Sequence, residues 1–168
     1  MFMEQTDSQP IQDQVDTKIK LGGTTQATAK QAAEFLLATK TGFCVPTKLQ
    51  RKNMLIVYAE QGFVLYGKAF DLVRCDIGVN YNDIDDIRRN INRLVIYEIK
   101  STNKISVQPD FSKYFFSIST AELLTAQNLG ERYRFAFVNT LSKTYLDLSL
   151  KDIFIKAKGI YPAWSIQF

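Results

Sequence analysis

The chain has 168 residues, of which 46% are apolar, 12% aromatic and 23% charged, a composition typical of one soluble globular domain with a substantial core. It contains no histidine, which excludes Ser-His-Asp and Cys-His catalysis and any zinc site built from imidazoles. The net charge is +4, and any chemistry must use carboxylates, lysines, hydroxyls or a metal held by carboxylates.

The first half of the chain is predicted to contain a helix followed by strands. Residues 1–27 are polar and acidic and are expected to form a flexible arm ahead of a domain over residues 28–168. A capping-box pair, Thr28 and Gln31, predicts a helix that ends near Gly42. Apolar runs then predict three strands, over residues 54–59, 63–75 and 93–100.

The second half is predicted to supply a helix and a further strand. The charged stretch 80–92 is expected to be a solvated insertion or a short helix. Ser119 and Glu122 form another capping box, and Gly130 predicts the end of that helix. Residues 132–140 alternate as a half-buried strand should. This order of elements predicts an α/β fold with a central mixed sheet flanked by helices.

The end of the chain and its cysteines carry weaker signals. An amphipathic stretch covers residues 149–157, and the hydrophobic tail 160–168 is a candidate for buried packing or a homodimer contact. Two cysteines, Cys44 and Cys75, are too few for a disulfide framework, so a reducing compartment is expected and a single bridge stays open. With no apolar run of about 20 residues and no signal peptide, we expect a soluble cytoplasmic protein.

The charge is divided unevenly along the chain. Residues 1–17 hold four acidic residues and no basic ones, whereas residues 18–168 hold all 21 basic residues against the other 13 of the 17 acidic ones, a net charge of +8. A basic body suits a polyanionic partner such as nucleic acid, and it also suits an ordinary basic surface.

The most informative residues are Glu98 and Lys100, at the end of the most hydrophobic predicted strand. Their spacing of two places both side chains on the same side of a sheet. Charged groups in such a strand are costly to bury unless they pair or serve a site. Asp71 interrupts another apolar run in the same way, so the three residues converge if the two strands are neighbours.

The chemistry of these three residues is coherent. A divalent cation relieves the repulsion between two carboxylates, and oxygen ligands with open positions favour Mg²⁺ or Mn²⁺. Such a metal can bind a phosphodiester oxygen and acidify a water molecule, while a lysine orients the water and stabilises developing charge.

Asp71 followed by Glu98-Ile99-Lys100 resembles the signature of the restriction-endonuclease-like, or PD-(D/E)XK, nuclease superfamily. The order of helices and strands over residues 28–140 is also similar to that family's α/β core. The resemblance implies that Asp71 and Glu98 bind Mg²⁺ and that Lys100 assists the attacking water. It also implies an additional acidic residue on the first helix, at the position of Glu34.

The resemblance implies an endonuclease that hydrolyses DNA phosphodiester bonds, like a small type II restriction enzyme. Two alternatives remain open: a repair or junction-resolving nuclease, and a non-catalytic nucleic-acid-binding module with the same fold. One active site cuts one strand, so a double-strand cutter of this size should be a homodimer.

The sequence departs from the family pattern at several places. Phe70 stands where the family often has proline, and the long gap before Glu98 leaves open whether Asp76 rather than Asp71 is the partner carboxylate. Glu34 also fits a solvated helix face. The run Asp83, Asp85 and Asp86 is interpreted as solvated charge rather than a metal cluster.

Candidate DNA contacts follow the motif and the first helix. They are Ser101, Thr102, Asn103, Lys48, Arg51, Lys52 and Lys104, with Lys113, Arg132 and Arg134 as further cations that could neutralise phosphates. Ser101 to Asn103 also fit a plain polar end to the strand. The run Tyr114-Phe115-Phe116 is interpreted as a core strand rather than a base-stacking platform.

Overall fold

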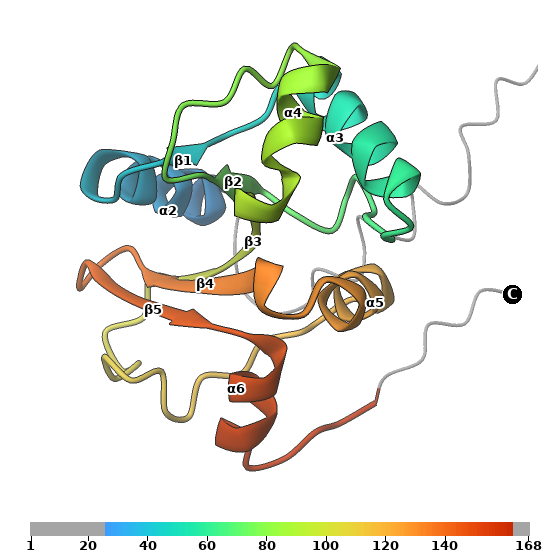
Figure 1. Ribbon diagram of the computed structural model, residues 1–168. Helices are drawn as coiled ribbons and strands as arrows, with labels where there is room; N and C mark the ends of the chain where they lie inside the picture. The colour runs from blue at the N-terminus through green and yellow to red at the C-terminus, as the bar shows by residue number, and fades with distance from the viewer. Residues whose placement is uncertain (1–25, 163–168) are drawn as a thin grey trace, which may run out of the picture.

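A computed structural model describes residues 26–162 and contains an open, five-stranded mixed sheet flanked by helices (Figure 1). The strands lie in the order β1-β2-β3-β4-β5. Only the β3–β4 pair is parallel, and the other neighbouring pairs are antiparallel. The strands are β1 (Phe43–Cys44), β2 (Leu72–Arg74), β3 (Val95–Thr102), β4 (Tyr133–Asn139) and β5 (Thr144–Leu148). The predicted α/β class with a mixed sheet is therefore confirmed.

The helices divide between the two faces of the sheet. One face, here called the four-helix face, packs against α3 (Lys48–Glu60), α4 (Ile84–Asn90), α5 (Thr120–Leu129) and α6 (Leu150–Lys156). The other, the α2 face, packs against α2 (Gln26–Thr39). In Figure 1, α2 and α5 lie to the left and right of β3 and β4. Among residues 26–162, no helix is long and apolar enough to cross a membrane.

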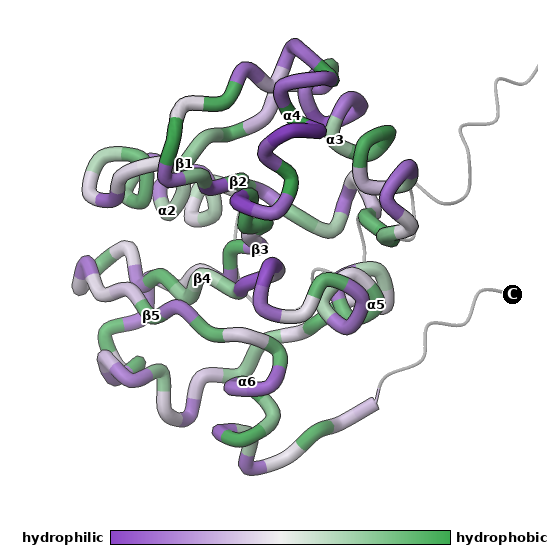
Figure 2. Tube along the Cα trace, in the orientation of Figure 1, coloured by the Kyte–Doolittle hydropathy of each residue, from purple (hydrophilic) through white to green (hydrophobic). Residues whose placement is uncertain are grey.

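Strand β3 supplies both cores because successive side chains point to opposite faces. Ile96 belongs to the larger core on the four-helix face, together with Phe135 and Phe137 of β4. Tyr97 and Ile99 belong to the smaller core under α2. Figure 2 shows the contrast between hydrophobic β3 and the largely hydrophilic outer helix α4. The alternation places Glu98 and Lys100 on the four-helix face.

The predicted strand over residues 54–59 is wrong, because this stretch lies inside helix α3. Thr47 caps the helix and forms a capping box with Gln50. Met54, Val57 and Tyr58 are buried, at the i, i+3, i+4 spacing of one helix face. The helical spacing was not recognisable because all residues of the run are apolar. The capping box at Thr47 and Gln50, several residues earlier, was the better indication of a helix.

The predicted strand over residues 63–75 is mostly wrong, since only its end, Leu72–Arg74, is a strand. The preceding residues form a loop in which the backbone N–H of Ala69 donates to the carbonyl of Tyr66 over 3.0 Å. The outer neighbour β1 has only two residues, so there is no long partner for an extended strand here. The chain enters β1 through Gly42, whose φ of +83° and contact with the carbonyl of Cys75 exclude a Cβ.

The later predictions agree with the structure. Stretch 80–92 contains the short helix α4, and Ser119 with Glu122 forms the capping box of α5, which ends at Gly130. Strand β4 confirms the strand expected over residues 132–140, and α6 lies in the amphipathic stretch 149–157. Strands β1 and β5 were not predicted; the residues of β5 are only half-buried and lack a clear alternation.

The two ends of the chain differ from expectation where they can be compared. Helix α2 begins at Gln26, so Thr28 lies within the helix rather than at its cap. The rest of the predicted arm and the end of the hydrophobic tail lie outside the described residues. Within the described part of the tail, Ile160 and Tyr161 are exposed. Cys44 and Cys75 are free thiols.

Candidate active site

Asp71, directly before β2, and Glu98 of β3 lie on the same face of the sheet. Leu72 pairs with Tyr97 in the antiparallel β2–β3 register, which places Asp71 opposite Glu98. The backbone N–H of Asp71 donates to the carbonyl of Tyr97 over 2.8 Å, and an Asp71 carboxylate oxygen accepts the backbone N–H of Ile99 over 2.9 Å. Asp71 is exposed, so it forms the solvent side of the cluster.

Lys100 joins Glu98 to a third carboxylate. Its Nζ lies 3.1 Å from Glu98 Oε1 and 2.7 Å from Glu122 Oε2. The side chains of Lys100 and Glu98 are only 11% and 12% exposed, and that of Glu122 is 11% exposed. Because buried charges need partners, the two glutamates compensate the buried charge of Lys100.

Glu122 is the site residue that the sequence argument missed. It was assigned only to the cap of α5, and its Oε2 does accept the backbone N–H of Ser119 over 3.0 Å. The same oxygen also meets Lys100. The connection between two parallel strands could have identified Glu122. Because β3 and β4 are parallel, the chain returns from one to the other through α5. The first turn of α5, which carries Glu122, therefore comes close to the end of β3.

Burial has the largest effect on the electrostatics of Glu98, followed by attraction to Lys100 and then by repulsion from the other carboxylates. Burial raises the pKa of Glu98 well above its usual range; Lys100 opposes this shift, and the charges of Asp71 and Glu122 add to it. Burial disfavours the charged form of Lys100, but the two glutamates outweigh burial and raise the pKa of Lys100. Lys100 therefore stays an ammonium group at neutral pH.

Arg51 of α3 closes the cluster from the side of the Asp71 loop. Its Nη1 donates to the carbonyls of Gly67 and Phe70 over 2.8 and 2.5 Å, and its guanidinium lies 4.1 Å from the centre of the Phe70 ring. Burial lowers the pKa of Arg51, against the opposing charges of Asp71 and Glu98. Its hydrogen bonds hold the loop that carries Asp71, a different role from the predicted DNA contact.

Two tyrosines fix the backbone on either side of the cluster. The hydroxyl of Tyr133, on β4, donates to the carbonyl of Ala69, two residues before Asp71. The hydroxyl of Tyr114 donates to the carbonyl of Ser101 over 2.8 Å, one residue after Lys100. Burial, followed by the charges of Glu98 and the other carboxylates, raises the pKa of Tyr133. Both hydroxyls therefore act as structural hydrogen-bond donors.

The other predicted DNA contacts fall into two groups. Ser101 and Thr102 are buried in β3, where the Thr102 carbonyl accepts the backbone N–H of Thr140 over 2.8 Å. Their buried side chains therefore have a structural place in the sheet. The remaining candidates are exposed and free to meet a ligand: Lys48, Lys52, Asn103 and Lys104.

The alternative acidic residues lie away from the cluster. Glu34 is on α2, whose buried residues pack on the opposite face of the sheet, and it lies 3.9 Å from Lys30 in an exposed ion pair. The structure therefore does not bring Glu34 to Glu98. Asp76 lies 2.7 Å from the guanidinium of Arg93, and this hydrogen bond lowers the pKa of Asp76. Asp71, not Asp76, faces Glu98.

The acidic run at the start of α4 has structural roles. Asp83 caps α4 by accepting the backbone N–H of Asp85 over 2.9 Å. Asp85 pairs with Arg88, and Asp86 pairs with Arg89 over 3.1 Å. The interpretation of this run as solvated charge is consistent with these contacts.

The cluster offers oxygen ligands suited to a hard cation. Within residues 26–162, no three or more Asp, Glu, Cys or His side chains are arranged to hold a metal ion jointly. Asp71 and Glu98 are nevertheless close enough to repel each other, and with Glu122 they place three carboxylates around two cationic side chains, Lys100 and Arg51. Two carboxylates with excess negative charge fit Mg²⁺ or Mn²⁺, which prefer oxygen donors.

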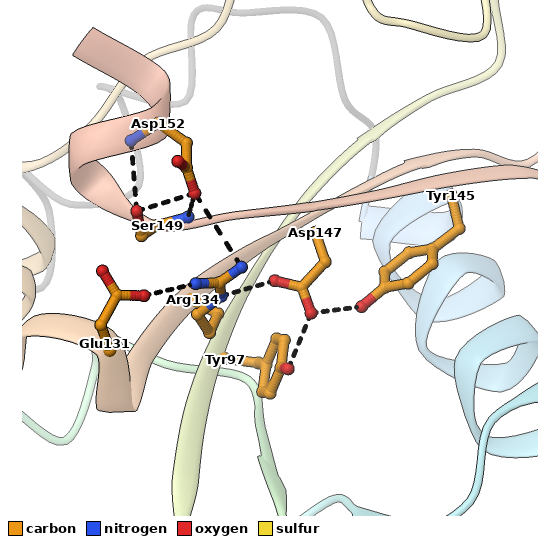
Figure 3. A network of polar contacts seen from close by, with 7 residues as sticks. All are labelled: Tyr97, Glu131, Arg134, Tyr145, Asp147, Ser149 and Asp152. Carbon is orange, nitrogen blue, oxygen red and sulfur yellow. Dashed lines mark hydrogen bonds and ion pairs between the residues drawn. The ribbon is translucent and has the colours of Figure 1, made fainter. Parts of the chain in front are cut away.

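A second polar network lies on the α2 face (Figure 3). Asp147 of β5 accepts a 2.7 Å hydrogen bond from Arg134 Nε, and its other oxygen accepts the hydroxyls of Tyr97 and Tyr145 over 2.9 and 3.0 Å. Arg134 also pairs with Glu131 over 2.7 Å. The donors from Arg134, Tyr97 and Tyr145 all point to carboxylates, and the network ties β3, β4 and β5 together.

No family model, curated protein or solved structure matches this chain. The arrangement of its own residues is therefore the basis for any proposal about its function.

Proposed function

We propose that this protein is a Mg²⁺-dependent endonuclease with a restriction-endonuclease-like core, which hydrolyses DNA phosphodiester bonds. One observation carries the proposal: the β2–β3 register sets Asp71 opposite Glu98, and Lys100 follows on the same face of β3. The order α2, β2, β3, α5, β4 supports it, because it matches the order of elements that the resemblance implies.

Each residue of the cluster has a defined part in this proposal. Asp71 and Glu98 would hold Mg²⁺ or Mn²⁺, which supplies Lewis acidity toward the phosphate and the attacking water. Lys100, kept cationic by its two carboxylate partners, donates hydrogen bonds toward the developing negative charge and orients the water. Glu122 positions the Lys100 ammonium group, and Arg51 holds the Asp71 loop.

The test is cleavage of supercoiled plasmid in Mg²⁺, in Mn²⁺ and in EDTA, by the wild type, Lys100→Ala and Lys30→Ala. Lys30 is an exposed lysine of α2, which packs on the opposite face of the sheet, and serves as the matched control. We expect cleavage by the wild type and the control with metal only, and a loss of at least about 100-fold in Lys100→Ala, as when one preorganised donor is removed. Thermal melting of each variant verifies that it folds.

A second measurement does not depend on activity. Mg²⁺ at ten times its Kd should stabilise the wild type by about 1.4 kcal/mol, and should leave the melting of Asp71→Asn unchanged. Absence of cleavage with either metal, together with no thermal shift, would overturn the proposal.

A non-catalytic nucleic-acid-binding module is the second candidate. It is favoured by the low exposure of Glu98 and Lys100 and by the complete pairing of the Lys100 ammonium with carboxylates. This candidate predicts salt-sensitive DNA binding with no cleavage under any divalent metal. Comparing intact, nicked and branched DNA in the same assay separates a restriction-like activity from a repair or junction-resolving one.

A further inference from the structure

In the segment between β3 and α5, the ring of Phe115 is exposed, whereas those of its neighbours Tyr114 and Phe116 pack into the core. The rings of Tyr114 and Phe116 contact Phe137 in the core, with centroid distances of 6.4 and 4.8 Å. Phe115, between them, is 69% exposed. The expectation of a core strand here is therefore wrong: the segment is not a strand, and its central residue faces solvent.

The backbone that presents Phe115 adopts an unusual conformation. Phe111 and Lys113 have φ values of 57° and 63°, in the left-handed region that non-glycine residues seldom occupy. Each such residue costs about 1 kcal/mol or more and is usually retained where it positions a functional group. Here the two residues turn the chain so that Phe115 points away from the core.

A second exposed ring accompanies Phe115. Tyr161, in the extended segment that follows α6 (Figure 1), is 76% exposed, and its ring centroid lies 6.5 Å from that of Phe115. The two rings come from segments far apart in the sequence. Together they form an aromatic surface, here called the Phe115–Tyr161 platform.

The surroundings of this platform are basic. The segments 103–118 and 150–162 contain two aspartates and five lysines, which are Lys104, Lys113, Lys151, Lys156 and Lys158, all of them exposed. Both aspartates accept hydrogen bonds from nearby backbone: Asp110 from Ser112 over 3.0 Å, and Asp152 from Ser149 over 2.9 Å. The two segments that carry the exposed rings therefore have a net charge of +3, although Lys156 and Lys151 lie close enough to Asp110 and Asp152 to add to the lowering of those carboxyl pKa values by the backbone hydrogen bonds.

The platform is attached to the candidate active site. Tyr114 precedes Phe115 directly, and its hydroxyl bonds the carbonyl of Ser101, one residue beyond Lys100. Lys100 is close enough to oppose the burial that raises the pKa of Tyr114. A ligand that stacks on Phe115 would therefore lie next to Tyr114, whose hydroxyl contacts the backbone directly after Lys100.

We propose that the Phe115–Tyr161 platform and its lysines bind a single-stranded segment of nucleic acid. Exposed rings stack on the faces of unpaired bases, and lysines neutralise the backbone that joins them. A duplex keeps its base faces inside the stack, so it cannot use the rings in this way. The positive charge favours nucleic acid over a protein partner. The inference rests on the proposed nuclease function and deepens it by placing an unpaired segment next to the duplex that the site would cleave.

The experiment measures binding in EDTA, so that it does not depend on cleavage. Fluorescence anisotropy follows labelled 20-nucleotide single-stranded DNA, the same sequence as RNA, and a 20-base-pair DNA duplex. We expect Phe115→Ala to weaken single-strand binding about tenfold or more and to change duplex binding by less than twofold. Phe115→Trp should retain affinity, because tryptophan also stacks. The DNA and RNA arms identify which strand is bound.

Two variants sharpen this test. Phe154→Ala is the matched control, because Phe154 is an aromatic residue of α6 that is 46% exposed and lines a groove against α5. We expect it to leave affinity unchanged. Lys113→Ala should lower the slope of log K against log salt for the single strand by about 0.7.

Three outcomes would overturn the inference. Phe115→Ala binds the single strand as tightly as the wild type does, or it loses affinity equally for the single strand and the duplex. The third is that the wild type is a dimer and Phe115→Ala a monomer, as measured by size-exclusion chromatography with light scattering. The last would identify the platform as a contact between two copies. Failure of plasmid cleavage, together with absence of the Mg²⁺-dependent thermal shift, would instead overturn the nuclease proposal and leave the binding result standing.

Discussion

The two faces of the sheet each bury a network of charged side chains, and the networks differ in how their charges are matched. On the α2 face, Asp147 is met by a guanidinium and two tyrosine hydroxyls. On the four-helix face, Asp71, Glu98 and Glu122 lie around Lys100 and Arg51, and repulsion between carboxylates helps to raise the pKa of Glu98.

This difference separates a structural network from a candidate site. A carboxylate whose oxygens all receive donors holds strands together and gains nothing from a further ligand. A buried group of carboxylates in excess over their cationic partners is costly by itself and gains from a cation. Both networks use residues of β3, so alternate side chains of one strand serve the two roles.

The largest expected contrast is in catalysis, between the matched variants Glu98→Gln and Asp147→Asn. Each replaces a largely or partly buried carboxylate, 12% exposed at Glu98 and 25% exposed at Asp147, with an amide of nearly the same shape. Glu98→Gln should lower Mg²⁺-dependent plasmid cleavage by at least about 100-fold, because it removes a proposed metal ligand. Asp147→Asn should stay within about threefold of the wild type. Equal losses in the two variants would contradict the assignment of separate roles.

The same two variants should differ in the opposite sense in stability. Asp147→Asn leaves Arg134 and two tyrosine hydroxyls without their charged acceptor, and we expect it to lower the free energy of unfolding by about 2 kcal/mol. Glu98→Gln loses its pairing with Lys100 but also the repulsion from Asp71 and Glu122, so its change should be below about 1 kcal/mol. Urea unfolding in EDTA measures both. A larger loss in Glu98→Gln would reverse the comparison.

The pH dependence of Tyr97 tests the α2-face network alone. Burial, followed by the charge of Asp147, raises the pKa of Tyr97 from 10.0 to about 12. Because this pKa is raised by folding, its contribution to stability is fully present below pH 10 and is lost as the pH rises toward 12. Tyrosinate absorbance of the wild type minus that of Tyr97→Phe should titrate near pH 12, and at lower pH in Asp147→Asn. The same midpoint in Asp147→Asn as in the wild type would show that Asp147 exerts no such effect.

The smallest effect is expected at Glu34, which sequence reasoning placed near the site and which lies on the other side of the sheet. Glu34→Gln should leave plasmid cleavage within twofold of the wild type. Loss of its exposed i, i+4 pair with Lys30 should lower the free energy of unfolding by only a few tenths of a kcal/mol. A fall in cleavage like that of Glu98→Gln would show that Glu34 acts on the site after all.

The predictions from sequence succeeded where a signal was local. The apolar run before Glu98 identified β3, and the pair Ser119 and Glu122 identified the start of α5. They failed where neighbours in space decide the outcome. The run 54–59 became a helix because the cap at Thr47 and packing against the sheet outweighed its strand-like composition. Strand β5 forms because its backbone pairs with the outer edge of β4.

By itself the sequence determined which residues carry charge on β3 and which face of the strand they share, because side-chain alternation is a property of the chain alone. Tertiary structure decided which charges meet. The β2–β3 register selected Asp71 over Asp76, and the crossover through α5 brought Glu122 to Lys100. It also placed Glu34 on the opposite face. These outcomes depend on contacts between residues far apart in the sequence, which no local pattern encodes.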